Sequence, residues 1–128
     1  MTTKLYEDTI AISDHYNEKA DCAVRAVSIA TSTAYEEVHK LFVKHGRRKR
    51  QRTPRAITKR VVRALGYKIV EERVVSRTVR TVERELMADR RYLIFVRGHV
   101  LPFAYGEIHD HVKGRAHRVR AVYWLKEK

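Results

Sequence analysis

Cys22, the only cysteine of the chain, stands where a thiol could act as a nucleophile. It follows Asp21, a suitable helix cap, and precedes "AVRAVSIAT", whose apolar spacing predicts a buried helix that begins at Cys22. In the first turn of a helix, free backbone N–H groups and the helix dipole stabilise a thiolate and lower the pKa of the thiol. The alternative is that Cys22 is a small core residue of an apolar helix.

A nucleophilic cysteine needs a histidine to accept the thiol proton and an acid to orient the histidine ring. Among the seven histidines, His99 opens the predicted strand "HVLPFAY", which turns at "YG" into "EIHDHV". With a two-residue turn, Leu101 lies opposite Asp110, and His99 is the diagonal neighbour of Asp110 on the same face. We therefore expect Cys22, His99 and Asp110 to form a triad, provided that the hairpin has this register.

A helical first half and a strand-rich second half must position these groups. Helices are predicted from Cys22, from Thr33 to Gly46, from Thr53 to Gly66 and from about Val79 to Ala88. The β-rich segments "YKIVEERVV", "RYLIFVR", "HVLPFAY", "EIHDHV" and "AHRVRAVYWL" are joined by short turns, which predicts an antiparallel sheet. The sequence thus predicts one α+β domain spanning residues 1–128. The apolar residues that share a face with His99 should pack on the Cys22 helix: Leu101, Phe103, Ile108 and Val112.

The order of these features resembles a known family. The segments "DCAVRAVSIAT", a basic loop ending in "TP", and "YLIFVRGHVLPFAYGEIHD" together resemble small papain-like cysteine peptidase proteins of bacteriophages and bacteria. These are similar to the peptidase domains that process bacteriocin leaders. The resemblance covers roughly residues 15–125 and implies a papain-like fold, in which the Cys22 helix packs on the C-terminal antiparallel sheet.

By this resemblance, Cys22 is the nucleophile, His99 the general base and acid, and Asp110 the orienting acid. It implies a cysteine hydrolase that cleaves a peptide, isopeptide or amide bond of a protein or peptide, without a cofactor. In such enzymes an amide side chain upstream of the cysteine helps to form the oxyanion hole. Where Gln is expected, six residues upstream, this chain has Tyr16, so the neighbouring Asn17 becomes the candidate.

A strongly basic composition supports a second class of function. The chain has 28 Lys and Arg residues against 15 Asp and Glu, a formal charge of +13, which should attract nucleic acid or another polyanion. The charge is densest in "HGRRKRQRTPR", residues 45–55, although such a run is often only a solvated loop. The alternative function is therefore a sequence-tolerant nucleic-acid-binding module on a papain-like scaffold, catalytically weak or inactive, with these phosphate-binding candidates: Arg47, Arg48, Lys49, Arg50 and Arg52.

A zinc site is the competing chemical interpretation of the hairpin, because His109 and His111 alternate onto one face and His117 follows nearby. No CxxC or HExxH motif accompanies them, so we expect these histidines on a solvent face and no metal. The lone cysteine, the acidic N-terminal segment and the lack of a long apolar run favour a reducing cytoplasm, that of the host if the protein is phage-encoded, and no membrane partner.

Overall fold

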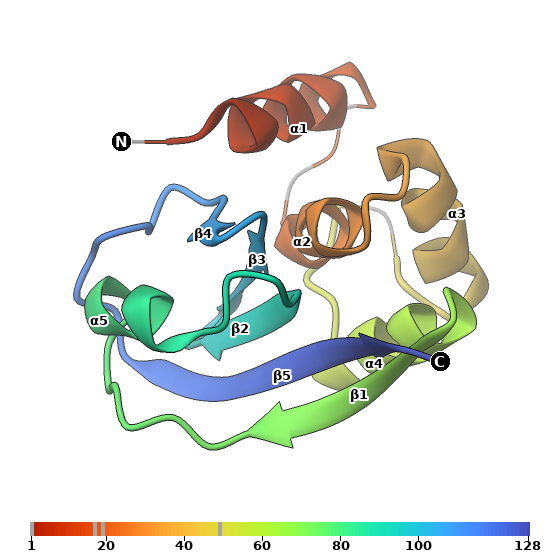
Figure 1. The fold of residues 1–128 in the computed structure, drawn as a ribbon. Helices are drawn as coiled ribbons and strands as arrows, with labels where there is room; N and C mark the ends of the chain where they lie inside the picture. Colours follow the sequence, from red (N-terminus) through yellow and green to blue (C-terminus); the bar gives the residue numbers. More distant parts are fainter. Residues whose placement is uncertain (1, 17, 19, 49) are drawn as a thin grey trace.

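In the computed structural model, which describes residues 2–16, 18, 20–48 and 50–128, helices form the first half of the chain, and an antiparallel sheet with one further helix forms the second half (Figure 1). Across these residues there are five helices and five strands. The helices are α1 (Lys4–His15), α2 (Cys22–Thr31), α3 (Tyr35–Lys44), α4 (Arg55–Ala64) and α5 (Val79–Glu85). The strands are β1 (Tyr67–Glu72), β2 (Tyr92–Val96), β3 (His99–Ala104), β4 (Glu107–Ile108) and β5 (Val119–Glu127).

The strands form one antiparallel sheet in the order β1-β5-β2-β3-β4, which confirms the predicted α+β class. β2 is buried along its whole length because helices cover both faces of the sheet at this strand. On one face, Leu93 and Phe95 join a core with α2, α3 and α4. On the other face, Ile94 and Val96 join a second core with α5.

The packing of the Cys22 helix differs from the prediction. The face of β3 that carries Leu101 and Phe103 packs with α5, whereas α2 packs on the opposite face, which carries Val100. Both faces of β2 and β3 are apolar, so alternation in the sequence did not show which face takes which helix. Cys22 therefore approaches His99 at the beginning of β3 rather than across the face of the sheet.

The hairpin register agrees with the prediction. Phe103 pairs with Ile108 and Ala104 with Glu107, which leaves the two-residue turn "YG". Both turn residues have positive φ angles, the conformation that suits a tight hairpin. β4 ends at Ile108, so Asp110 lies just beyond the strand rather than within it.

The helix α1 was not predicted. It buries only the polar residues Thr9 and Ser13, so it lacks the apolar stripe by which a helix is recognised in a sequence. Figure 1 shows α1 at the top of the view, over α2 and β4. Its contact with the rest of the chain is largely polar; the Thr3 hydroxyl, at its N-cap, lies 2.7 Å from Nδ1 of His109.

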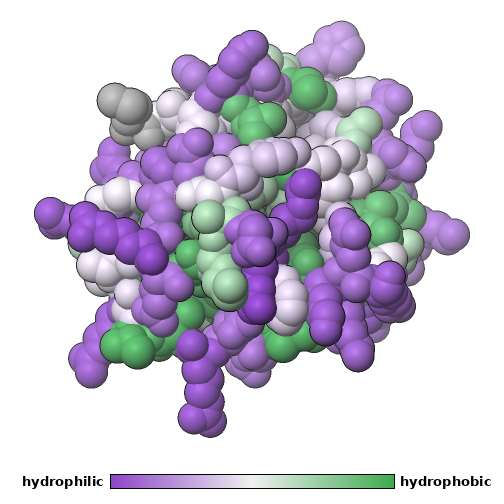
Figure 2. Space-filling model, in the orientation of Figure 1, coloured by the Kyte–Doolittle hydropathy of each residue, from purple (hydrophilic) through white to green (hydrophobic). Residues whose placement is uncertain are grey.

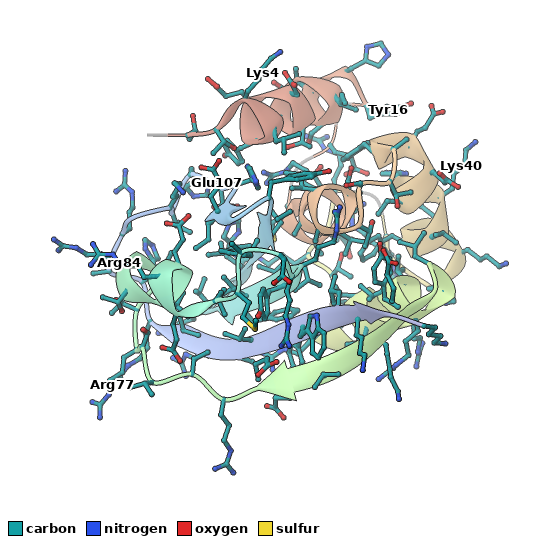
Figure 3. All side chains as sticks on the ribbon, in the orientation of Figure 1. Lys4, Tyr16, Lys40, Arg77, Arg84 and Glu107 are labelled. Atoms are coloured by element: carbon teal, nitrogen blue, oxygen red, sulfur yellow. The ribbon has the colours of Figure 1, made fainter. Side chains whose placement is uncertain are left out.

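Most charged side chains extend into solvent, as the labelled Lys4, Lys40, Arg77 and Arg84 do in Figure 3. The face drawn in Figure 2 is correspondingly hydrophilic, with only small, separate hydrophobic patches. None of the helices that the structure describes has the length and apolar content to span a bilayer.

Candidate active site

Cys22 is the first residue of α2, as predicted, and its thiol is free and half-buried. Burial, the largest single effect, raises the pKa of this thiol, whereas hydrogen bonding to His99 and the charge of its ring lower it. The backbone N–H of Val100 and the charge of Arg25 act in the same direction. The net result is a pKa below the ordinary value for a thiol. Cys22 therefore has the environment of a reactive cysteine rather than that of an inert core residue.

His99 lies between Cys22 and Asp110. Its Nε2 is 2.9 Å from each carboxylate oxygen of Asp110, so the N–H at this nitrogen donates to the acid. The other ring nitrogen, Nδ1, is then the one available to Cys22. Burial lowers the pKa of His99, but the hydrogen bonds to Asp110 and Cys22 and their negative charges raise it to about 9. At neutral pH His99 is therefore mostly an imidazolium, and its charge lies beside the thiol whose pKa it lowers.

Asp110 is held in place by several donors. It is only 2% exposed, and its Oδ1 accepts a hydrogen bond of 3.1 Å from the backbone N–H of Val112. Nδ1 of His111 is also 3.1 Å from Oδ1. A buried carboxylate with fixed donors keeps its orientation, so it can select one ring orientation and one tautomer of His99.

Asp21 was expected to cap α2, but its side chain makes no capping hydrogen bond. Its carboxylate instead accepts hydrogen bonds of 2.7 Å from the Ser13 hydroxyl of α1 and the Tyr35 hydroxyl of α3, and one of 3.1 Å from Arg25. These donors outweigh burial and lower the pKa of Asp21, so the group is an anion in the folded protein. Asp21 thus fixes the start of α2 by joining three helices, a role that local sequence spacing does not reveal.

Glu18 is a second buried carboxylate that sequence reasoning missed. It accepts hydrogen bonds from Nη1 and Nη2 of Arg47 at 2.9 and 3.2 Å, from His39, and from the backbone N–H of Arg50 at 2.9 Å. These donors overcome the effect of burial and lower the pKa of Glu18 to about 2. The acid lies four residues before Cys22, so it anchors the basic loop beside the nucleophile.

The residues of that basic loop have different environments. Arg47 is only 4% exposed and is paired with Glu18, so it is not presented to solvent in this conformation. Arg48, Arg50 and Arg52 are exposed, and Arg52 also lines the cleft beside Cys22. Lys49 lies outside the described residues. Nucleic-acid binding by this loop remains a prediction, with a smaller exposed set than the sequence suggested.

The oxyanion-hole candidate Asn17 also lies outside the described residues. The neighbouring Tyr16 donates its hydroxyl to a carboxylate oxygen of Glu36 at 2.8 Å. Its phenol is therefore engaged on α3. The backbone N–H groups at the beginning of α2 have no helical partner and are available to stabilise an oxyanion near the thiol.

The histidines considered for zinc do not share one face. His109 is buried and its Nε2 donates to the Ala104 carbonyl at 2.8 Å, whereas His111 and His117 are exposed. The potential ligand atoms that do lie close together, within 4.8 Å, belong to His99, Asp110 and His111. Asp110 already bonds with both histidines, so these contacts would have to open to admit an ion.

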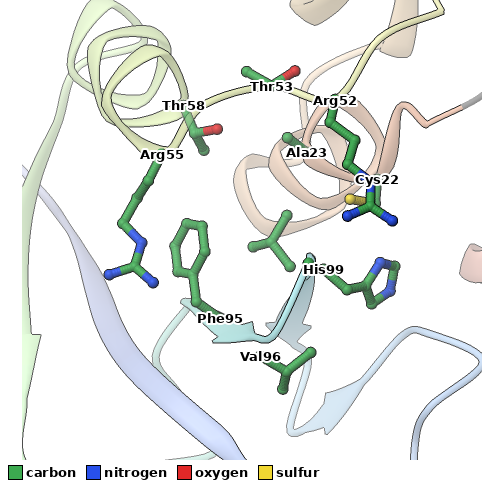
Figure 4. Close-up of a pocket in the computed structure, with 11 residues that line it drawn as sticks. Cys22, Ala23, Arg52, Thr53, Arg55, Thr58, Phe95, Val96 and His99 are labelled. Atoms are coloured by element: carbon green, nitrogen blue, oxygen red, sulfur yellow. The ribbon is translucent and has the colours of Figure 1, made fainter.

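A cleft of about 170 Å³ opens beside Cys22 and His99 (Figure 4). It lies between the beginning of α2, the segment that leads into α4, the end of β2 and the beginning of β3. A substrate carbonyl could approach the thiol from this cleft, whose walls are formed by these residues: Cys22, Ala23, Arg52, Thr53, Arg55, Thr58, Phe95, Val96, Gly98, His99 and Val100.

Comparison with known proteins yields no match: no family model fits the sequence, and no curated protein and no solved structure is significantly similar to it. The function must therefore be argued from the arrangement of the described side chains.

Proposed function

We propose that this chain is a cysteine hydrolase with a papain-like arrangement of nucleophile helix and sheet. The observation that carries the proposal is the line of three groups, Cys22, His99 and Asp110, in which the thiol has a lowered pKa and the imidazole a raised one. These groups come from the start of a helix, the start of a strand and the segment after a hairpin. A nucleophile, a base and an orienting acid in this order are the parts that acyl transfer requires.

The reaction begins when the Cys22 thiolate attacks the carbonyl carbon of a peptide, isopeptide or other amide. The negative charge that develops on the carbonyl oxygen accepts hydrogen bonds from backbone N–H groups at the start of α2. The His99 imidazolium donates its proton to the departing amine, and an acyl group remains on the sulfur. His99, now neutral, takes a proton from water, and the resulting hydroxide attacks the thioester to release a carboxylic acid and Cys22.

The placement of the charged groups bears on the choice between a hydrolase and a nucleic-acid-binding module. Arg47 is neutralised by Glu18, and Arg52 lines the cleft, so the basic run contributes to the surroundings of the thiol as well as to the surface. Burying the charged Asp110 beside His99 also costs free energy, and a catalytic role would explain why this chain has such a pair. Both facts favour catalysis over a purely electrostatic binding module.

Acylation by p-nitrophenyl acetate tests this proposal without knowledge of the substrate. The expected result is a burst of p-nitrophenol equal to the protein concentration, and an acetyl group located on Cys22 by mass spectrometry. Cys22→Ala should abolish the burst and His99→Ala should slow it strongly, whereas His15→Ala, at an exposed histidine of α1, should leave it unchanged. A protein that releases p-nitrophenol equally with and without Cys22 would refute the proposal.

A further inference from the structure

The cleft beside Cys22 contains unpaired donors and no acid. Two arginines, Arg52 and Arg55, are among its lining residues, and no Asp or Glu is. In the described part of the chain, Arg52 makes neither a hydrogen bond nor an ion pair. An unpaired guanidinium next to a reactive sulfur can bind an anionic group of a ligand.

A glycine leaves room for the Arg52 side chain beside His99. Gly98 has a φ angle of +69°, and a Cβ atom at this position would lie 2.8 Å from Nη1 of Arg52. The absence of a side chain at Gly98 therefore lets the guanidinium lie against the turn that precedes His99. Figure 4 shows Arg52 extending toward Cys22 and His99 from the segment before α4.

Two hydroxyl groups in the cleft wall also have no hydrogen-bond partner among the described residues. Thr58 is only 1% exposed, and its hydroxyl has no hydrogen-bond partner among the described residues; the same is true of the buried hydroxyl of Thr53. Both residues line the cleft, and Figure 4 shows the Thr58 hydroxyl directed toward its interior. Leaving a buried hydroxyl unpaired is costly, so a ligand that accepts a hydrogen bond here would gain affinity.

The remaining walls suit an aliphatic stem. Phe95 and Val100 provide apolar surface, and Arg55 is stacked over the Phe95 ring at 4.5 Å from its centroid. A ligand with a few methylene groups and a terminal anion therefore matches both parts of the cleft. The net charge of +13 would further attract such a ligand at low ionic strength.

We propose that the cleft selects substrates in which the residue next to the scissile bond is an aspartate or glutamate. The carboxylate binds Arg52 and accepts hydrogen bonds from the Thr58 and Thr53 hydroxyls, while its methylene groups lie on Phe95. This inference rests on the proposed function for its substrate class, but the charge of the cleft is measurable without turnover.

Two matched alkylating reagents test the charge. Iodoacetate and iodoacetamide attack the same thiolate and differ by one negative charge, so the ratio of their rates at Cys22, divided by the ratio measured with glutathione, reports the anion preference of the cleft. We expect this normalised ratio to exceed one and to fall about tenfold or more in Arg52→Gln, the effect expected for loss of one hydrogen bond to a charged group. Arg48→Gln, an exposed arginine of the same loop that does not line the cleft, should leave it unchanged.

A second pair of probes tests the hydroxyl. Chloromethyl ketones of N-acetylglutamate and N-acetylglutamine carry the matched side chains, and the glutamate reagent should inactivate the protein about tenfold faster. Thr58→Val should remove most of this preference while leaving the melting temperature equal or higher, because it deletes a buried hydroxyl that has no partner.

The outcomes separate the two proposals. A normalised ratio that is the same in the wild type and in Arg52→Gln, or equal inactivation by the two ketones, would overturn the inference while leaving Cys22 an activated thiol. If instead neither alkylating reagent reacts faster than it does with glutathione, the proposed hydrolase function fails, whereas a ratio that still depends on Arg52 would support the anion-binding cleft.

Discussion

Replacing Asp110 by Asn should lower the pKa of His99 and weaken the effect of the imidazolium on the Cys22 thiol. The Asp110 carboxylate presents both oxygens at 2.9 Å from Nε2 and makes the largest of the contributions that raise this pKa from 6.5 to about 9. This rise corresponds to about 3 kcal/mol of preference for the imidazolium. Loss of the carboxylate should lower the pKa of His99 by about one to two, because Asn carries no charge.

The protonated fraction of His99 should change most near pH 8. A histidine with a pKa of about 9 is roughly 90% protonated there, and one with a pKa of about 7.5 is roughly 25% protonated. Carbon-labelled histidine rings report this midpoint directly by NMR, in the wild type and in Asp110→Asn. Because the thiol and the imidazole titrate together, the same pair of measurements in a Cys22→Ala background isolates the contribution of Asp110.

Only the Asp110 carboxylate should affect the midpoint of His99. Asp14→Asn, at an exposed position of α1, should leave the His99 midpoint unchanged. An equal midpoint for wild type and Asp110→Asn would mean that the carboxylate does not stabilise the imidazolium, and the triad interpretation would be refuted. A lower midpoint without any loss of acyl transfer would refute the assigned role of Asp110 in catalysis.

Three further predictions follow from the charged groups. In His99→Ala, alkylation of Cys22 by iodoacetamide should require a higher pH, because burial still raises the pKa of the thiol and His99 no longer lowers it. His15→Ala is the control. If the alkylation rate depends on pH in the same way in His99→Ala and in the wild type, Cys22 and His99 are not coupled. In the wild type, hydrolysis should decline as pH rises through about 9, when His99 loses the proton it gives to the leaving group, whereas alkylation, which needs only the thiolate, should not decline. The pKa of Glu18 is about 2 in the folded protein against an ordinary value of 4.5, so this group contributes about 3 kcal/mol to the free energy of unfolding above pH 4.5. That contribution is lost as the pH falls toward 2. In urea unfolding across this pH range, Glu18→Gln should therefore lose less stability than the wild type, whereas the exposed Glu37→Gln should behave like the wild type.

The predicted parts of the site are those that local sequence determines. The helix at Cys22 follows from an uninterrupted run of apolar and small residues, and the pairing of His99 with Asp110 follows from the length of one turn. In both, the partners are joined by a short segment whose geometry is restricted to a few forms. The sheet likewise followed from runs of β-branched and aromatic residues separated by turns.

The parts that were missed depend on contacts between distant segments. Glu18 and Arg47 have no local relation, yet their ion pair decides that one arginine of a basic run is buried. The α1 helix packs through hydroxyl groups, and the side of the sheet that α2 covers depends on the total packing of three helices. Residue spacing carries no signal for these polar contacts, because charged and hydroxyl side chains are equally common at solvent-exposed positions.

The basic loop therefore also has a structural role that its composition does not suggest. Glu18 binds the Arg47 guanidinium and the Arg50 backbone N–H, which fixes the chain two residues before Arg52. The same glutamate lies four residues before Cys22, so one buried carboxylate holds both the nucleophile segment and the loop that carries the cleft arginine. Because a buried acid with several donors has one well-defined geometry, Glu18 can set the distance between thiol and guanidinium without touching a substrate. The arginines of the loop are thus divided between holding the site together, through Arg47, and giving it a charge preference, through Arg52.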